Sequence, residues 1–352
     1  MIRHAQRLLL LFGIALCVLL VAQVGVAQIC RDLRLMGWSL LGLVLLEFGV
    51  DVLNTIGWRY TFTIEERCVP FGSLFLARLA GTAFNQILPA ATVGGEPVKA
   101  LLLRAHLPIS STLASVVTGK LTYSVAQAAF AFAGVLFAFQ AFALPVGLRR
   151  GLLASLALTV VGIGFFLWLQ RRGLFATAAT VTQRLGLPDR WGDAIEHATH
   201  LLDDRVRDFH VDRPLDFVLS VGCHLAGLLV GVLQVYLLLS WLGLPAGFAT
   251  CFTIEALAVL IQAAAFLVPG SIGVQEGGKV MIFSALGLPP AAGLSVGLAF
   301  RLNQVVGIAL GLAAYAVLHW RQPPKVDPQA SLLAPRHSQP TSIEPKPSAP
   351  LP

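Results

Sequence analysis

Two stretches of the chain decide its fold. Residues 87–99 read ILPAATVGGEPVK, and residues 267–279 read LVPGSIGVQEGGK. Both contain a proline, six intervening residues, a glutamate, two residues and a lysine, and the second copy lies 180 positions after the first. Proline and paired glycines interrupt a helix and leave backbone groups without intrahelical partners. Each stretch therefore predicts a helix that ends near the proline and a second helix that begins near Pro97 or Gly277.

The duplication extends beyond these stretches. Leu107-Pro108 corresponds to Leu288-Pro289 with an offset of 181 positions. With the same offset, Lys120 corresponds to Arg301. A basic residue thus recurs about a third of the way along the apolar segment that follows each break. We interpret the two regions as copies of one unit.

The composition requires the bilayer to be part of this protein's solvent. Of the 352 residues, 56% are hydrophobic and 12% are charged, and the mean hydropathy is +0.77. A soluble domain carries about 25% charged residues, so this chain cannot coat a soluble surface. Its net charge of +7 comes mostly from basic residues between apolar segments, which is typical of membrane orientation. We therefore predict no nucleic-acid partner.

Apolar segments of about 20 residues predict membrane-spanning helices. The six predicted spans cover residues of about 8–29, 35–56, 110–143, 151–169, 215–243 and 290–320. The first span is either an uncleaved anchor or a cleaved signal peptide. Its length and the weak cleavage site at residues 25–27 favour the anchor.

The distribution of Lys and Arg predicts a multi-pass protein of the cell inner (plasma) membrane with both termini in the cytoplasm. Segment 171–213 is rich in arginine, and because acidic and basic residues alternate in it, we expect a cytoplasmic amphipathic insert or a simple solvated connector. Residues 321–352 are rich in proline and serine without an apolar period. They are predicted to form a disordered cytoplasmic tail.

The predicted architecture is an all-α integral membrane protein with about six transmembrane helices and two re-entrant hairpins. The membrane domain covers residues 1–320, with repeat one at about 8–143 and repeat two at about 151–320. Because three full spans per copy is an odd number, the second copy enters the membrane upside down, which makes a 3+3 inverted repeat. In transporters, the broken helices of such repeats meet near the bilayer midplane and hold the substrate.

The candidate substrate-binding residues lie at and after the two breaks. They are Asn85, Pro89, Gly94, Gly95, Glu96, Lys99, Lys120, Pro269, Gly270, Gly273, Glu276, Lys279 and Arg301. Glutamate and lysine three positions apart share one helical face, so each such pair either neutralises itself or helps helix N-termini to grip an anionic head group. Lys120 either adds charge to that grip or extends to the membrane interface.

Further polar residues flank the breaks. Asn85 and Gln86 precede the first proline, and Asn303 and Gln304 follow the basic residue of the second copy. They are expected to bind either freed backbone carbonyls or a ligand. Arg78 is expected to pair with an acid of the second span. The five cysteines and eight histidines show no metal-ligand or redox spacing, and we predict no metal, no cofactor and no catalytic residue.

Two patterns carry a resemblance to a known family. They are Asn85…Leu88-Pro89 followed by Gly94-Gly95-Glu96, and Pro269-Gly270…Gly273-Val274…Glu276. In this order they resemble the flippase-like transmembrane region of the lysylphosphatidylglycerol synthase family, over about residues 5–320. The family commonly has Pro-Gly in the first copy where this chain has Pro89-Ala90, so the shape of that turn is expected to differ.

The resemblance implies a function in lipid movement. Full-length members flip an aminoacylated phospholipid that a cytoplasmic transferase domain makes. This chain stops after the membrane region, so the resemblance implies no synthase activity. Stand-alone relatives include proteins associated with hopanoid metabolism, which implies either an anionic or a hopanoid-type lipid as cargo.

Three functions are compatible with these features. The favoured one is a lipid transporter or flippase without enzymatic activity. The second is a membrane-embedded enzyme that modifies a lipid head group, with Glu96 or Glu276 as acid or base. The third is a scaffold subunit for a separate lipid-modifying enzyme. The sequence contains no phosphate-binding loop for ATP. Lipid movement would therefore either be driven by ion coupling or follow the concentration gradient of the lipid.

Overall fold

The computed structural model describes residues 26–87, 94–142, 146–171, 209, 212–264, 271 and 273–320. Over these residues the chain is helical apart from short turns, and it forms no strand. The predicted all-α class is confirmed for them. Most of the first predicted span, most of the insert 171–213 and the tail 321–352 lie outside the described residues.

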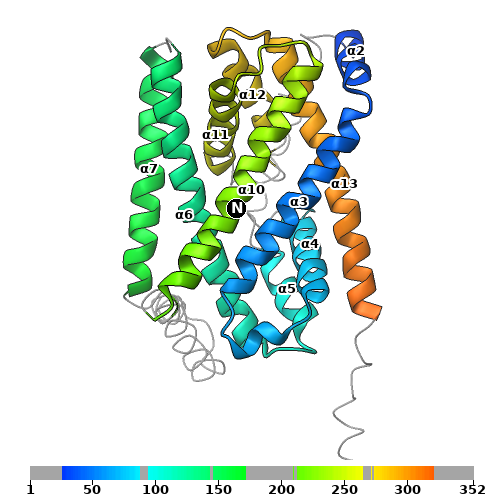
Figure 1. Cartoon of the computed structure of the whole chain (residues 1–352), viewed down its shortest axis with the longest axis vertical. Coiled ribbons are helices and arrows are strands. Elements are labelled where there is room, and N and C mark those ends of the chain that lie inside the picture. The colour runs from blue at the N-terminus through cyan, green and yellow to red at the C-terminus, as the bar shows by residue number, and fades with distance from the viewer. Residues whose placement is uncertain are drawn as a thin grey trace, which may run out of the picture.

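Long helices form the body of the molecule (Figure 1). They are α3 (Ser39–Tyr60), α6 (Ile109–Ala141), α7 (Val146–Arg171), α10 (Pro214–Trp241) and α13 (Pro290–Trp320). Each lies within a few residues of a predicted span. Among the described residues, α3, α6, α10 and α13 are long and apolar enough to cross a membrane. A helix of 33 residues such as α6 is about 50 Å long, which exceeds the ~30 Å of bilayer hydrocarbon. The chain is therefore a multi-pass membrane protein.

Shorter helices complete the bundle. They are α2 (Val26–Met36), α4 (Phe71–Ile87), α5 (Glu96–Leu103), α11 (Phe248–Ala264), α12 (Val274–Ala285) and the 3-10 turn η1 (Glu65–Cys68). The ends of α4 and α11 and the starts of α5 and α12 lie at the two predicted breaks. Pro97 occupies the first turn of α5, where its missing N–H has no intrahelical role. Gly273, which precedes α12, has a φ of +77°, a conformation that favours glycine.

We call α4 with α5 the first broken pair and α11 with α12 the second. The two broken pairs occupy opposite halves of the bundle. Figure 1 shows α4 and α5 in its lower half and α11 and α12 in its upper half. The first helix of each pair packs on the long helix of the other half, α4 on α13 and α11 on α6. The second helix packs on the long helix that follows it in the chain, α5 on α6 and α12 on α13. Between the two halves, α3 packs along α10.

Small residues allow α4 to pack closely on α13 and α11 to pack closely on α6. A Cβ atom on Gly311 of α13 would lie 2.5 Å from the carbonyl oxygen of Leu79 and 2.6 Å from the Cβ of Ala83, both on α4. A Cβ atom on Gly134 of α6 would lie 2.0 Å from the Cβ of Ala256 on α11. Close helix contacts in membranes are typically made by such residues, because lipid supplies no hydrophobic driving force between helices.

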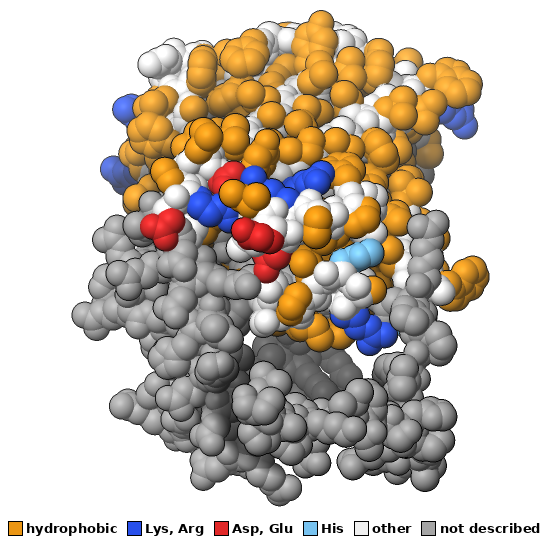
Figure 2. Space-filling model, turned by 60° about the horizontal axis from the view of Figure 1, so that its bottom comes forward, with side chains coloured by type: hydrophobic (Ala, Val, Ile, Leu, Met, Phe, Trp, Pro, Cys, Tyr) orange, Lys and Arg blue, Asp and Glu red, His pale blue; other side chains and the backbone are white. Residues whose placement is uncertain are grey.

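The lower end of the bundle carries charged side chains below a largely apolar surface (Figure 2). Asp216 at the start of α10 pairs with Arg67 and with Arg213, at 2.6 Å in both cases. Arg213 also donates to the carbonyl oxygens of Tyr60 at 3.1 Å and Phe62 at 2.8 Å. These contacts join the α3–α4 connection to α10.

Candidate functional site

A polar cluster around Glu96 joins the two helices of the first broken pair to α6. Glu96 Oε2 pairs with Lys99 Nζ at 2.8 Å, and Oε1 pairs with Lys120 Nζ at 3.0 Å. The Asn85 amide donates to Glu96 Oε1 at 3.1 Å, and Asn85 Oδ1 accepts the Gly95 N–H at 2.7 Å. Asn85 thus binds the backbone that the helix break frees.

Glu276 has the corresponding position in the second broken pair. Its Oε1 accepts from Arg301 Nε at 2.8 Å and Nη2 at 2.7 Å, and its Oε2 accepts the Gly273 N–H at 2.8 Å. Arg301 also donates to Gln304 Oε1 at 2.6 Å and to the Ser271 carbonyl at 3.4 Å. The Glu276 side chain is only 2% exposed, so this cluster is more deeply buried than the first.

The two clusters have the same arrangement of glutamate and basic residue on the following helix, but their lysines make different contacts. Lys120 and Arg301 each connect the second helix of a broken pair to the following long helix. Lys99 pairs with the glutamate of its own copy. Lys279, which is 8% exposed, lies with its Nζ 4.7 Å from the centre of the Phe300 ring. Lys279 lines the same pocket as Glu255.

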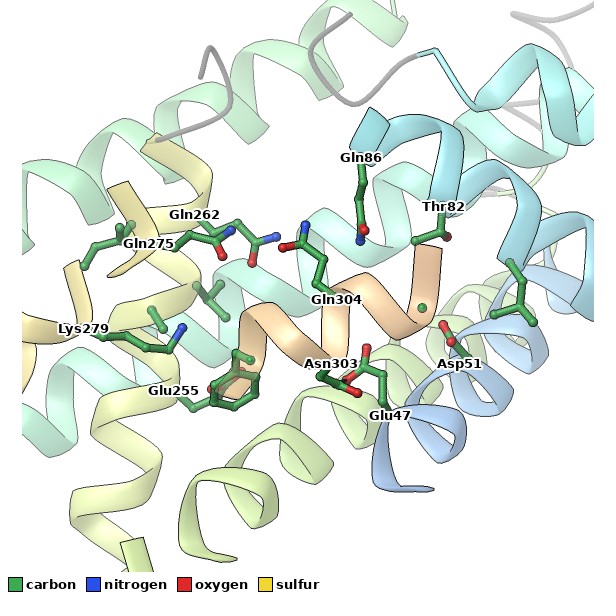
Figure 3. Close-up of a pocket in the computed structure, with 16 residues that line it drawn as sticks. Glu47, Asp51, Thr82, Gln86, Glu255, Gln262, Gln275, Lys279, Asn303 and Gln304 are labelled. Atoms are coloured by element: carbon green, nitrogen blue, oxygen red, sulfur yellow. Dashed lines mark hydrogen bonds between the residues drawn. The ribbon is translucent and has the colours of Figure 1, made fainter. Parts of the chain in front are cut away.

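A polar pocket of about 210 Å³ lies where the two broken pairs face each other (Figure 3). Helices α3, α4, α11, α12 and α13 all contribute to it. Its polar lining residues are Glu47, Asp51, Thr82, Gln86, Glu255, Gln262, Gln275, Lys279, Asn303 and Gln304. The pocket thus combines residues from both halves of the chain.

The hydrogen-bonding capacity of the pocket is only partly used by the protein itself. Glu47 Oε2 accepts from the amides of Gln234 at 3.0 Å and Asn303 at 3.3 Å. Asp51 pairs with Arg78, which confirms the expectation that Arg78 contacts an acid of the second span. Gln86 Oε1 is buried and has no hydrogen-bond partner in the described part of the chain. A buried carbonyl oxygen without a partner is costly in a protein interior, so this atom is available for a ligand.

The structure divides the predicted site residues into groups. Lys279 lines the pocket. Asn85, Gly95, Glu96, Lys99 and Lys120 form the first cluster, and Gly273, Glu276 and Arg301 form the second. Gly94 lies in the turn before α5. Pro89, Pro269 and Gly270 lie outside the described residues.

Several pocket residues were not predicted as site residues. Glu47, Asp51 and Glu255 are acids within apolar segments, and such residues are functional candidates because their desolvation has to be offset. That signal is visible in the sequence. Gln262 and Gln275 carry no comparable signal, because an uncharged amide in an apolar segment is unremarkable until its neighbours are known.

Comparisons with known proteins agree with the resemblance found at the two breaks. Residues 7–311 match the family described as the lysylphosphatidylglycerol synthase TM region. The chain is also similar to a UPF0104 membrane protein of Methanothermobacter thermautotrophicus (strain Delta H), with 26% identity over 329 residues, covering 89% of this chain and 95% of the relative. No solved structure matches the chain. Because the family match covers most of its length, this protein belongs to the lysylphosphatidylglycerol synthase TM region family.

Proposed function

We propose that this protein is a lipid transporter that moves a polar lipid between the leaflets of the inner membrane without altering it chemically. The observation that carries the proposal is the polar pocket between the two broken helix pairs. A polar group buried in hydrocarbon costs several kcal/mol unless protein, water or a ligand satisfies it. A lipid head group that crosses the bilayer meets the same cost. A pocket of hydrogen-bonding side chains in the bundle lowers that cost.

The pattern of helix contacts supports a 3+3 inverted repeat behind this pocket. In the two copies α3 corresponds to α10, α4 to α11, α5 to α12 and α6 to α13. Each major helix contact has an observed counterpart under this correspondence, and the α3–α10 contact is its own counterpart. For example, α4 on α13 becomes α11 on α6. The broken pairs also lie at opposite ends of the bundle (Figure 1). This is the arrangement expected when two copies meet around one site that opens alternately to either side.

The geometry favours a transporter over a head-group-modifying enzyme. A general acid or base has to reach the proton that it transfers. Both oxygens of Glu276 are already bonded, to Arg301 and to the Gly273 N–H. Both oxygens of Glu96 are held by lysines. Neither glutamate lines the pocket. Their ion pairs are better explained as contacts that hold the helices of each copy together.

Reconstituted protein is expected to move a polar lipid between vesicle leaflets without changing its mass. Fluorescent lipid in the outer leaflet, reduced by dithionite, measures the movement, and mass spectrometry of the same vesicles measures the lipid. Gln262→Trp, which places a large ring at the pocket lining, is expected to slow movement by at least tenfold. Gln140→Trp on the exposed surface of α6 is the matched control and should retain the rate. A lipid of altered mass would favour the enzyme instead.

Topology reporters are expected to show both ends of the chain in the cytoplasm. Fusions after Arg34, Arg150 and Gly243 should report the periplasm, and fusions after Arg67, Arg190 and Gln322 the cytoplasm. The end of α6, the start of α7 and the α10–α11 connection lie at the upper end of Figure 1, and the α3–α4 connection lies at the lower end. A cytoplasmic signal after Gly243 would contradict the inverted repeat, because that connection sets the direction of the second broken pair.

A further inference from the structure

We infer that the central pocket binds an uncharged polyhydroxyl head group, of the sugar or polyol type, and discriminates against an anionic one. The inference rests on the proposed function, because it assumes that the pocket receives a lipid head group. It identifies the chemical class of that group. The pocket's charges, its hydrogen-bonding groups and its size each bear on the class.

The charges of the pocket oppose an anion. Among the described residues, its lining contains the carboxylates of Glu47, Asp51 and Glu255 and one ammonium, that of Lys279. Arg78 pairs with Asp51, and Lys279 lines the pocket together with Glu255. Glu47 is bonded by amides alone among the described residues. A phosphate group placed here would face a carboxylate that forms no ion pair with the described residues, and like charges at short range repel strongly in a low dielectric.

The cations of the two glutamate clusters are occupied by acids of the protein. Lys99 and Lys120 both pair with Glu96, and Arg301 makes two contacts with Glu276. Recruiting Lys99 or Arg301 to a phosphate would break a largely buried ion pair, which is strongly unfavourable. Lys120 is 44% exposed, and recruiting it would take one of the two lysines from Glu96. The arrangement therefore disfavours an anionic head group, which was one of the two cargoes expected from the sequence.

The hydrogen-bonding groups of the pocket suit hydroxyls better than amines. Figure 3 shows Gln86, Gln262, Gln275 and Gln304 around one space. Each amide offers two donors and one acceptor, whereas an ammonium has donors only. An ammonium head group would therefore accept nothing from the amide donors. A hydroxyl both donates and accepts, so several hydroxyls on one group satisfy the amides, the carboxylates and the free Gln86 Oε1 together.

The size of the pocket suits a single small head group. A volume of about 210 Å³ is smaller than that of pockets for drug-sized ligands, which is about 300–1,000 Å³. The acyl or terpenoid part of the lipid must therefore lie outside it. Leu79, Val259 and Phe300 line the pocket beside the polar groups and offer contacts to the C–H face of a ring.

Lipid binding to the purified full chain in detergent tests this inference. Native mass spectrometry would titrate monoglucosyl diacylglycerol, phosphatidylglycerol and an ammonium-headed diacylglycerol, all with the same acyl chains. We expect the glucosyl lipid to bind at least tenfold more tightly than either charged lipid. Gln86→Leu and Gln275→Leu should each weaken its binding at least fivefold, whereas Gln140→Leu, on the exposed face of α6, should not.

A second variant tests the charge argument. Glu47→Gln keeps the shape of the side chain and removes its charge, so it should raise the affinity for phosphatidylglycerol at least fivefold while the glucosyl lipid still binds. A thermal melt of each variant shows whether it is folded. Tighter binding of either charged lipid than of the glucosyl lipid in the unaltered protein overturns the inference. So does unchanged glucosyl-lipid binding in both glutamine variants.

The test separates this inference from the proposed function. If the glucosyl lipid binds through the pocket glutamines but never changes leaflet in vesicles, the chemical class stands and the transport proposal fails. If phosphatidylglycerol binds most tightly and is moved between leaflets, the transport proposal stands and the inferred class is wrong.

Discussion

Glu276→Ala is expected to lower the free energy of unfolding by about 3–5 kcal/mol, the range found when one partner of a buried ion pair is removed. The Arg301 guanidinium would lose its carboxylate, and the Gly273 N–H would lose its acceptor. The Glu276 side chain is 2% exposed, so its loss leaves these donors in the protein interior. Denaturant unfolding in detergent, followed by tryptophan fluorescence, measures the loss.

Two controls make the cause of this loss testable. Glu65→Ala removes an exposed glutamate and should change stability by no more than about 0.5 kcal/mol. The double variant Glu276→Leu with Arg301→Met removes both charges and should recover most of the loss, because well-packed apolar residues often replace a buried pair without cost. A double variant as unstable as Glu276→Ala would show that the unpaired charge is not the cause.

Gly95→Ala is expected to disrupt the first broken pair and to stop lipid movement. A Cβ atom on Gly95 would lie 1.8 Å from the Gly81 carbonyl oxygen and 2.7 Å from its carbonyl carbon. These are backbone atoms of α4, so relief requires α5 to move away from α4. Overpacking typically costs about 1–3 kcal/mol, and this contact belongs at the upper end. Unfolding curves and the vesicle assay measure the two effects.

Gly72→Ala is the matched control for this variant. Gly72 lies in the first turn of α4, and no atom lies within 4 Å of the position where its Cβ would be placed. Alanine is the better helix former by roughly 0.5–1 kcal/mol, so stability should stay the same or rise slightly. If Gly72→Ala were as harmful as Gly95→Ala, the close approach of α4 and α5 would not explain the result.

The sequence by itself determined the membrane class and the positions of the helices and their breaks. In lipid every backbone group has to be bonded within the protein, so long apolar segments become helices with few alternatives. Proline and glycine interrupt them by local effects that need no partner. The offset of 181 positions between Lys120 and Arg301 also indicated their equivalence, and the structure gives both the same role toward a glutamate of their own copy.

Only the tertiary structure decided which side chains share the pocket. A membrane helix is apolar on most of its surface, so its sequence does not show which face is turned to a neighbour and which to lipid. Packing of α4 on α13 and of α11 on α6 brings Gln86 and Gln262 to one space (Figure 3). Packing of α12 on α13 places Lys279 at that space, whereas Lys99 pairs with Glu96. Such convergence depends on contacts between helices far apart in the chain, which a pattern of nearby residues does not contain.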